Sequence, residues 1–248
     1  CEWVIPDKPE EGEDLQVDFK PKYLDETLIS TPSLALARCR LEIGRLGERV
    51  VDMFSKVLLA VLTGSKGNLQ EIVEIDDEVD ALYGHIVLFL GKLSKTNLSD
   101  EQAEELMYLL QTVDRFENIG DIMENDMVNV GIKRIDENIV VSKATMNFIN
   151  KYHQQVACAL LDTVEVVANE DVDAIKRVRR TKGEIASLAL ETAQHGIERL
   201  TADEPNRLKT YNREQETIEH MDRIYRICRR IAGSAPTKVS EVQPTEAT

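Results

Sequence analysis

The distribution of proline is the feature that most limits how this chain can fold. Seven prolines occur among 248 residues, but none lies between Pro32 and Pro205. Because proline breaks the interior of a helix, this span can hold long, uninterrupted helices. Aromatic residues make up only 5% of the chain, and no segment shows the sustained alternation of a half-buried strand. We therefore predict an all-α fold.

Apolar residues recur in steps of three and four along the proline-free span, as in the packed seam of a helix. The first seam begins after Pro32 and consists of Leu36, Cys39, Ile43, Leu46, Val50, Met53, Val57 and Ala60. Similar seams predict six helices, at about 32–62, 69–93, 99–134, 142–168, 170–200 and 204–232.

The six helices form an internal repeat. When the second helix is laid on the fifth, Ile72 falls on Val178, and when the third is laid on the sixth, Phe116 falls on Met221. The first and fourth helices can be aligned at more than one offset, so this part of the repeat is weaker. A duplicated three-helix unit predicts two repeated antiparallel three-helix bundles. The expected organisation is an acidic, partly disordered lead-in at 1–31, repeats at 32–135 and 142–232, and a disordered tail at 233–248.

Charge and cysteine content restrict the function classes. The formal net charge is −15, which argues against a nucleic-acid partner. No apolar stretch is long enough to span a bilayer, and no signal peptide is evident. The chain opens on Cys1 instead of methionine, so we expect a piece of a longer protein. The cysteines lack CxxC spacing, which favours a reducing compartment with Cys39, Cys158 and Cys228 as small core residues.

Acidic residues interrupt the seam of the first repeat. Asp76 occupies an apolar position with Asp80 one turn later, and Asp114, Glu117 and Asp121 share a face of the third helix, with Glu124 and Asn125 further along. Buried carboxylates are costly unless they are paired or bound to a cation. Oxygen ligands without histidine suit Mg²⁺, Ca²⁺, Mn²⁺ or iron. The candidate metal ligands are Asp76, Asp80, Glu117 and Asp121. The alternative is a solvated acidic face, because 45 of the residues are acidic and such pairs also arise by chance.

The second repeat carries different residues at the equivalent positions, namely Lys182, Ala186, Asp222 and Arg226. An internal ion pair there could replace a metal. The sequence therefore predicts at most one metal cluster, within residues 69–134. A basic run from Lys176 to Lys182 is interpreted as a solvated helix face, with a site for an anion or an acidic partner as the alternative.

The acidic motifs resemble those of a known family. Residues 115–121, Arg-Phe-Glu-Asn-Ile-Gly-Asp, resemble the signature of PhoU proteins, which regulate phosphate uptake. The family pattern of an acid followed four residues later by Asp is matched by Asp76/Asp80 and Glu117/Asp121. The resemblance implies two repeated three-helix bundles and a multinuclear metal cluster, of iron, manganese, magnesium or zinc, at these acids. The missing motifs of the second repeat imply one cluster at most.

The segment before the first helix carries a second resemblance. Residues 19–25 and 32–36, together with Glu42, resemble the linker after the last membrane helix of bacterial sodium/phosphate cotransporters that carry a PhoU-like cytosolic tail. This implies a soluble regulatory domain at the cytoplasmic face of the inner membrane, with the transporter domain of the same full-length protein as its partner. The alternative is a stand-alone PhoU-type adaptor that negatively regulates phosphate uptake and signalling.

Enzymatic activity is not expected. Four-helix di-metal enzymes use Glu-x-x-His ligands, and no histidine has that spacing here. Nucleophile-elbow, P-loop, dinucleotide-binding and HExxH motifs are also missing from the sequence. His153 lies on a helix seam and is interpreted as a hydrogen-bonded core residue. A homodimer is expected from helix seams that a three-helix unit leaves open.

Overall fold

The computed structural model describes residues 19–200 and 207–236, and it contains no strand within these ranges, so the all-α prediction is confirmed. The short 3₁₀-helix η1 spans Glu26–Ser30. Five long helices follow their predicted positions closely. They are α1 (Pro32–Thr63), α2 (Lys66–Leu93), α5 (Lys143–Asn169), α6 (Val172–Leu200) and α7 (Arg207–Ser234). The remaining predicted helix consists of α3 (Asp100–Asp121), the π-helical turn η2 (Ile122–Met127) and α4 (Val128–Asp136).

Local side chains fix several helix starts. The Ser65 hydroxyl accepts a hydrogen bond from the Asn68 N–H, and the Asn68 side-chain oxygen accepts one from the Ser65 N–H, which forms a capping box for α2. Ser99 and Gln102 do the same for α3. Pro32 occupies the first position of α1, where its missing N–H costs no intrahelical bond.

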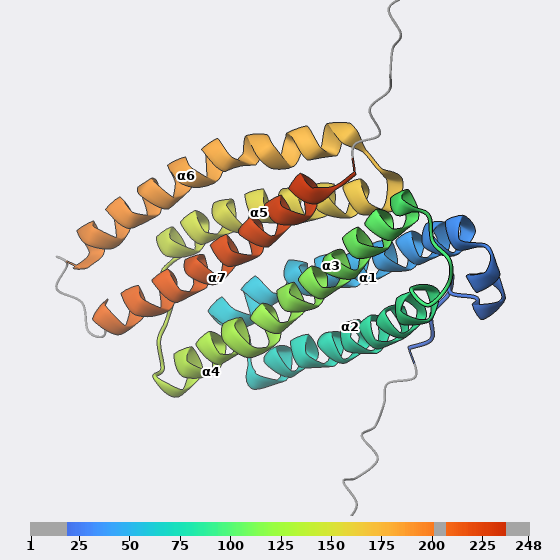
Figure 1. Cartoon of the computed structure of the whole chain (residues 1–248). Helices are drawn as coiled ribbons and strands as arrows, with labels where there is room; N and C mark the ends of the chain where they lie inside the picture. Colours follow the sequence, from blue (N-terminus) through green and yellow to red (C-terminus); the bar gives the residue numbers. More distant parts are fainter. Residues whose placement is uncertain (1–18, 201–206, 237–248) are drawn as a thin grey trace, which may run out of the picture.

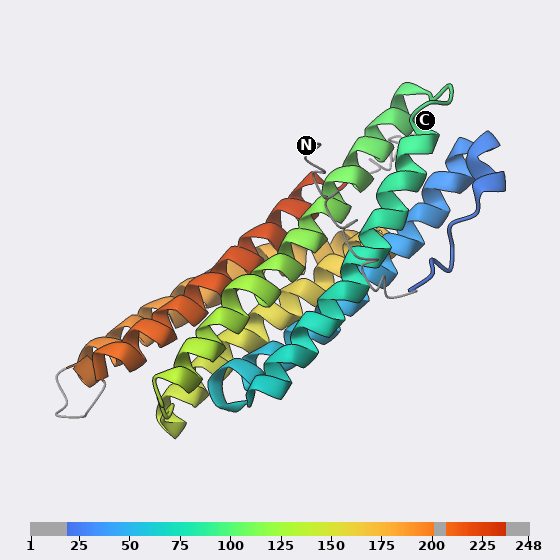
Figure 2. The same ribbon diagram turned by 90° about the horizontal axis from the view of Figure 1, so that it is seen from below.

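The helices pack as two groups of three. Helices α1, α2 and α3 contact one another, as do α5, α6 and α7, and α1 packs along α5 to join the groups (Figure 1). The view from below shows α2 beside α3, and α3 beside α7 (Figure 2). One continuous hydrophobic core contains buried residues from both groups. The limits proposed for the two repeats remain a prediction.

Two glycines of α1 permit the close packing of the groups. A β-carbon at Gly44 would lie 2.8 Å from Ala168 Cβ, and one at Gly47 would lie 2.8 Å from Val164 Cγ2. Either contact is too short for real side chains, so α1 and α5 can approach this closely only with glycine at these positions.

The structure describes part of each chain end. Residues 19–31 are placed against α1 and include η1, and α7 continues through Ser234, so part of the predicted tail is helical. Residues 1–18 and 237–248 lie outside the described residues. Cys39 and Cys228 are buried as predicted, but Cys158 is exposed on α5, so its assignment to the core is wrong. None of the helices in the described ranges has the length and apolar character needed to cross a bilayer.

Candidate metal centre

Three carboxylates meet where α2 passes the end of α3. One oxygen each from Asp76 on α2, Asp121 at the end of α3 and Glu124 in η2 lies within 4.8 Å of the other two. Asp76 is buried with 3% of its surface exposed, whereas Asp121 is exposed and Glu124 is half-buried. The trio therefore has one ligand atom in the interior and two at the rim, within reach of one cation.

The buried member of the trio has an unsatisfied oxygen. Asp76 Oδ1 has no hydrogen-bond partner. It lies against Gly120 of α3, at a point that a β-carbon on residue 120 would overlap. Buried polar atoms almost always have a partner, because an unpaired one loses its hydration without compensation. A cation at this position would supply the missing partner of Asp76.

Electrostatics at the centre favour bound positive charge. Burial, reinforced by the negative charges of Asp80, Glu124, Asp121 and Glu117, raises the pKa of Asp76 to about 8. Burial and neighbouring acids also raise the pKa values of Asp80, Glu117 and Glu124. In the part of the chain that the structure describes, none of these five acids forms an ion pair with a lysine or arginine. Their repulsion is therefore uncompensated by the protein.

The predicted ligand set and the observed trio overlap in two residues, Asp76 and Asp121. Asp80 and Glu117 lie outside the trio, although both are close enough to raise the pKa of Asp76. Glu124 joins the trio although it was not among the predicted ligands. Its position seven residues after Glu117 places it on the same helix face, a signal that a pattern of acids four residues apart does not capture. The predicted set itself remains a prediction.

The helix is locally irregular at the centre. Glu124 lies in the π-helical turn η2, which directly follows Asp121. Single π-helical turns inside α-helices often mark functional sites. The Asn125 side chain, also in η2, donates a hydrogen bond of 3.2 Å to Asp121 Oδ1 and so holds that carboxylate in place.

The donor chemistry fits a hard cation. All close ligands are carboxylates, which suit Mg²⁺, Mn²⁺, Ca²⁺ and Fe³⁺ better than zinc, since structural zinc favours cysteine and histidine. His153 is no ligand here, because its Nε2 lies 2.8 Å from the Phe54 carbonyl oxygen and its ring stacks on Phe54. Among the described residues, no other trio of acids, histidines and cysteines comes this close.

The equivalent region of the second repeat does not contain the predicted internal ion pair. Asp222 does pair with Arg226, but the Arg226 side chain is 67% exposed. Lys182 and Ala186 are exposed as well. The prediction of an internal pair is therefore wrong, and the Asp222–Arg226 pair lies at the surface. The basic run of α6 is exposed as predicted, with Arg177 paired to Asp162 and Asp171.

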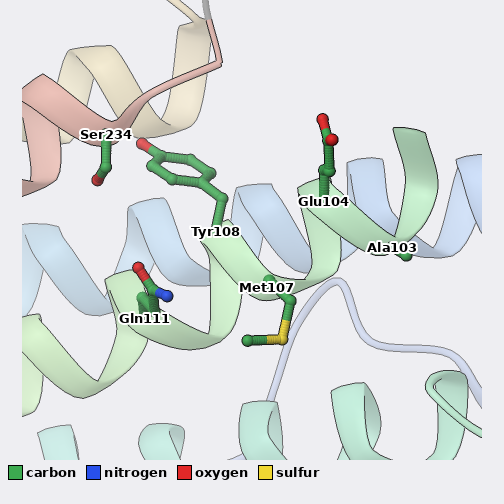
Figure 3. A pocket seen from close by; sticks show the side chains of 6 residues that line it. All are labelled: Ala103, Glu104, Met107, Tyr108, Gln111 and Ser234. Carbon is green, nitrogen blue, oxygen red and sulfur yellow. The ribbon is translucent and has the colours of Figure 1, made fainter. Parts of the chain in front are cut away.

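A shallow groove lies apart from the centre, toward the start of α3. It has a volume of about 400 Å³ and is lined by Ala103, Glu104, Met107, Tyr108, Gln111 and Ser234. The Tyr108 ring points from α3 toward Ser234 at the end of α7 (Figure 3). Glu104 is its one charged lining residue, so the groove offers no second acid for a cation.

Comparison with known proteins places the acids in a recognised domain. The sequence pattern of the PhoU domain matches residues 43–126, a segment that contains all five acids of the centre. The crystal structure of PhoU from Pseudomonas aeruginosa has a similar fold, with a TM-score of 0.71 at 17% identity over 79% of this chain and 93% of that one. The chain therefore carries a PhoU domain match and shares the PhoU fold.

Longer relatives extend the comparison. Proteins of Escherichia coli K12 and Salmonella typhimurium that carry the provisional name inorganic phosphate export protein YjbB are 24% and 25% identical over 224 residues. The aligned region covers 90% of this chain and 40% of each relative. The chain thus spans less than half the length of these relatives.

Proposed function

We propose that this chain is a cation-dependent, PhoU-type regulatory module of phosphate homeostasis and that it catalyses no reaction. The buried, unpartnered Oδ1 of Asp76, beside two further carboxylates, carries the cation-dependent part of the proposal. The PhoU domain match over residues 43–126 and the PhoU-like fold support the regulatory part. We expect the module to bind at most one metal cluster and no nucleic acid.

An adaptor of the stand-alone PhoU type is the preferred form of this function. The solved structure with a similar fold is that of PhoU, and the family match is to the PhoU domain. In this form the module acts in the cytoplasm, as a monomer or homodimer, and restrains phosphate transport by contacting a transporter.

A module linked to a membrane transporter is the second candidate. It is favoured by relatives that are much longer than this chain and are named for phosphate export. In that form the partner is a membrane domain of the same protein. The direction of phosphate transport is then export, instead of the sodium-coupled uptake expected from the sequence. Sequencing the gene on both sides of the segment that encodes this chain would distinguish the two forms.

Metal binding by the purified chain tests the central claim. After loading with manganese, iron or magnesium and removal of the excess, elemental analysis should find near-stoichiometric metal. The Asp76→Asn variant should lose it, and Glu124→Gln should weaken it at least tenfold. Asp77→Asn is the matched control, since Asp77 is an exposed neighbour on the same helix and lies outside the trio. A parent protein that retains no metal after loading would contradict the proposal.

Regulation is tested in cells. A strain that expresses the parent chain should show altered phosphate transport, measured with labelled phosphate, and the Asp76→Asn variant should lose this effect while Asp77→Asn keeps it. Equal transport with parent and Asp76→Asn at matched protein levels would count against cation-dependent regulation.

A further inference from the structure

A fully buried carboxylate holds residues 19–25 on α1. Glu42 has no exposed surface, and its Oε2 accepts hydrogen bonds from the backbone N–H groups of Lys22 at 2.7 Å and Tyr23 at 2.6 Å. Arg45 donates to Glu42 Oε1 at 2.7 Å and to the Lys20 carbonyl at 3.0 Å. Because a buried carboxylate is costly without such donors, Glu42 and this segment depend on each other.

Two arginines of α1 extend this contact to Phe19. The Arg45 guanidinium lies 4.4 Å from the centre of the Phe19 ring, and the Arg49 guanidinium lies 5.9 Å from it. Both distances fall within the range of a cation–π interaction. The N-terminal end of the described chain is therefore held by backbone, charge and ring contacts that all come from one face of α1.

Arg49 also reaches the helix that carries Asp76. Its Nη2 lies 2.6 Å from Glu78 Oε2 on α2. Glu78 is two residues from both Asp76 and Asp80. The same guanidinium thus contacts Phe19, Glu78 in the acidic motif of α2 and, through Nη1 at 3.1 Å, Asp52 of its own helix.

We propose that cation binding at the metal centre and docking of residues 19–25 on α1 are coupled through Arg49. This inference rests on the proposed function and names how the metal centre is regulated. A cation fixes Asp76 against Asp121 and Glu124, and so restricts the turn of α2 that carries Glu78. Arg49 is then held more firmly between Glu78 and Phe19, which strengthens the docking of the segment.

Thermodynamic linkage makes the coupling reciprocal. If the cation strengthens docking by some factor, docking must raise cation affinity by the same factor. A coupling of typical size corresponds to roughly fivefold or more. Weakening the Glu42 contact should therefore lower cation affinity although Glu42 is no ligand.

The backbone amides of Lys22 and Tyr23 report docking directly, because both donate to Glu42. Their hydrogen exchange is measured by NMR in the full chain with and without Mg²⁺. We use Mg²⁺ as the probe because it is diamagnetic, whereas Mn²⁺ would broaden the signals. We expect Mg²⁺ to slow both amides severalfold in the parent. In Arg49→Gln, studied at Mg²⁺ concentrations that saturate its metal centre, this slowing should disappear. Lys66→Gln is the matched control, since it removes an exposed charge whose ion-pair partner, Asp136, is not shared with Arg49.

Each outcome bears on the inference. If the parent binds Mg²⁺ but the two amides exchange unchanged, the coupling is overturned and the proposed function stands. Slowing that persists in Arg49→Gln overturns the route through Arg49. A parent that binds neither Mg²⁺ nor Mn²⁺ overturns both proposals. If Arg49→Gln fails to fold, Arg49→Lys provides the same comparison, because it keeps the charge but loses the planar fork that spans both contacts.

Discussion

Asp76 Oδ1 packs against the backbone of Gly120 on the neighbouring helix, at a point where any β-carbon would overlap the oxygen. Glycine within a helix costs roughly 0.5–1 kcal/mol relative to alanine. Glycine at position 120 nevertheless allows α2 and α3 to approach each other while the Asp76 carboxylate lies between them. The position of the Asp76 carboxylate between the two helices therefore depends on glycine at position 120.

The Gly120→Ala substitution should damage this arrangement. The added methyl group would displace Asp76 Oδ1, and we expect the free energy of unfolding to fall by about 1–3 kcal/mol despite the better helix propensity of alanine. Cation affinity should fall as well, because the carboxylate is moved. Urea denaturation and a metal titration of the same variant measure the two effects.

Gly84→Ala on α2 is the control for this substitution. No atom lies within 4 Å of a β-carbon at Gly84, so alanine there should stabilise the protein by about 0.5–1 kcal/mol. Destabilisation at both positions would show that helix geometry, and not the contact with Asp76, determines the result at position 120.

The raised pKa of Asp76 predicts a pH dependence of the metal-free protein. Its folded-state pKa is about 8, against an ordinary value of 3.8. Its favourable contribution is complete below about pH 4 and is lost as the pH rises toward about 8. With metal removed by a chelator, the unfolding free energy should fall between about pH 5 and about pH 8, by at most about 1.4 kcal/mol per pH unit from this group.

The Asp76→Asn variant isolates this contribution. Asparagine cannot ionise, so the variant should gain stability relative to the metal-free parent as the pH rises. Burial lowers the pKa of His153 and opposes this trend at acidic pH, but that effect is common to both proteins and cancels in their difference. A difference that stays constant from about pH 5 to about pH 8 would show that Asp76 titrates normally.

A functional residue is predictable from the sequence where it breaks a pattern. Asp76 is recognisable because an acid occupies an apolar seam position, and the structure buries it. Glu124 is missed because its role depends on how α2 and the π-helical turn η2 meet, and no residue type marks a π turn. Asp80 and Glu117 match the motif spacing equally well, but spacing along a helix does not fix distances between helices.

The second repeat shows a related limit. Laying one repeat on the other aligns Lys182 with Asp76 but does not fix how closely α6 packs on α7. The long side chains of lysine and arginine can extend to solvent, and Lys182 and Arg226 are exposed. The short side chain of Asp76 cannot extend to solvent in this way, so its carboxylate is buried. Sequence equivalence therefore does not transfer burial from one repeat to the other.

The exposed Asp222–Arg226 pair should contribute little to stability. Exposed ion pairs are typically worth about 0–1 kcal/mol. A double-mutant cycle with Asp222→Ala and Arg226→Ala, followed by urea denaturation, should give a coupling energy within this range that shrinks at high salt. Because Tyr152 also donates a hydrogen bond of 3.4 Å to Asp222, the cycle is repeated in Tyr152→Phe. A coupling well above this range would show that solvent screens the pair less than the exposure of Arg226 indicates.

Removal of the Glu42 carboxylate should release residues 19–25. In Glu42→Ala the N–H groups of Lys22 and Tyr23 lose their shared acceptor, and we expect a loss of about 2–4 kcal/mol in the free energy of unfolding. Trypsin should then cleave faster after Lys22, which limited proteolysis with mass spectrometry measures. Glu48→Ala, at an exposed position of the same helix, should change neither quantity. Unchanged cleavage in Glu42→Ala would mean that other contacts hold the segment.

The Tyr108 hydroxyl should contribute nothing to stability. Tyr108 is 6% exposed, its hydroxyl has no hydrogen-bond partner, and burial raises its pKa. Removing an unpaired buried polar group relieves its desolvation cost, so Tyr108→Phe should be neutral or stabilise the protein by about 1 kcal/mol, as measured by urea denaturation. Tyr225→Phe is the matched comparison, because its buried hydroxyl donates a 3.1 Å hydrogen bond to the Val178 carbonyl and its loss should destabilise. Equal destabilisation by both substitutions would indicate that an ordered water in the groove satisfies Tyr108.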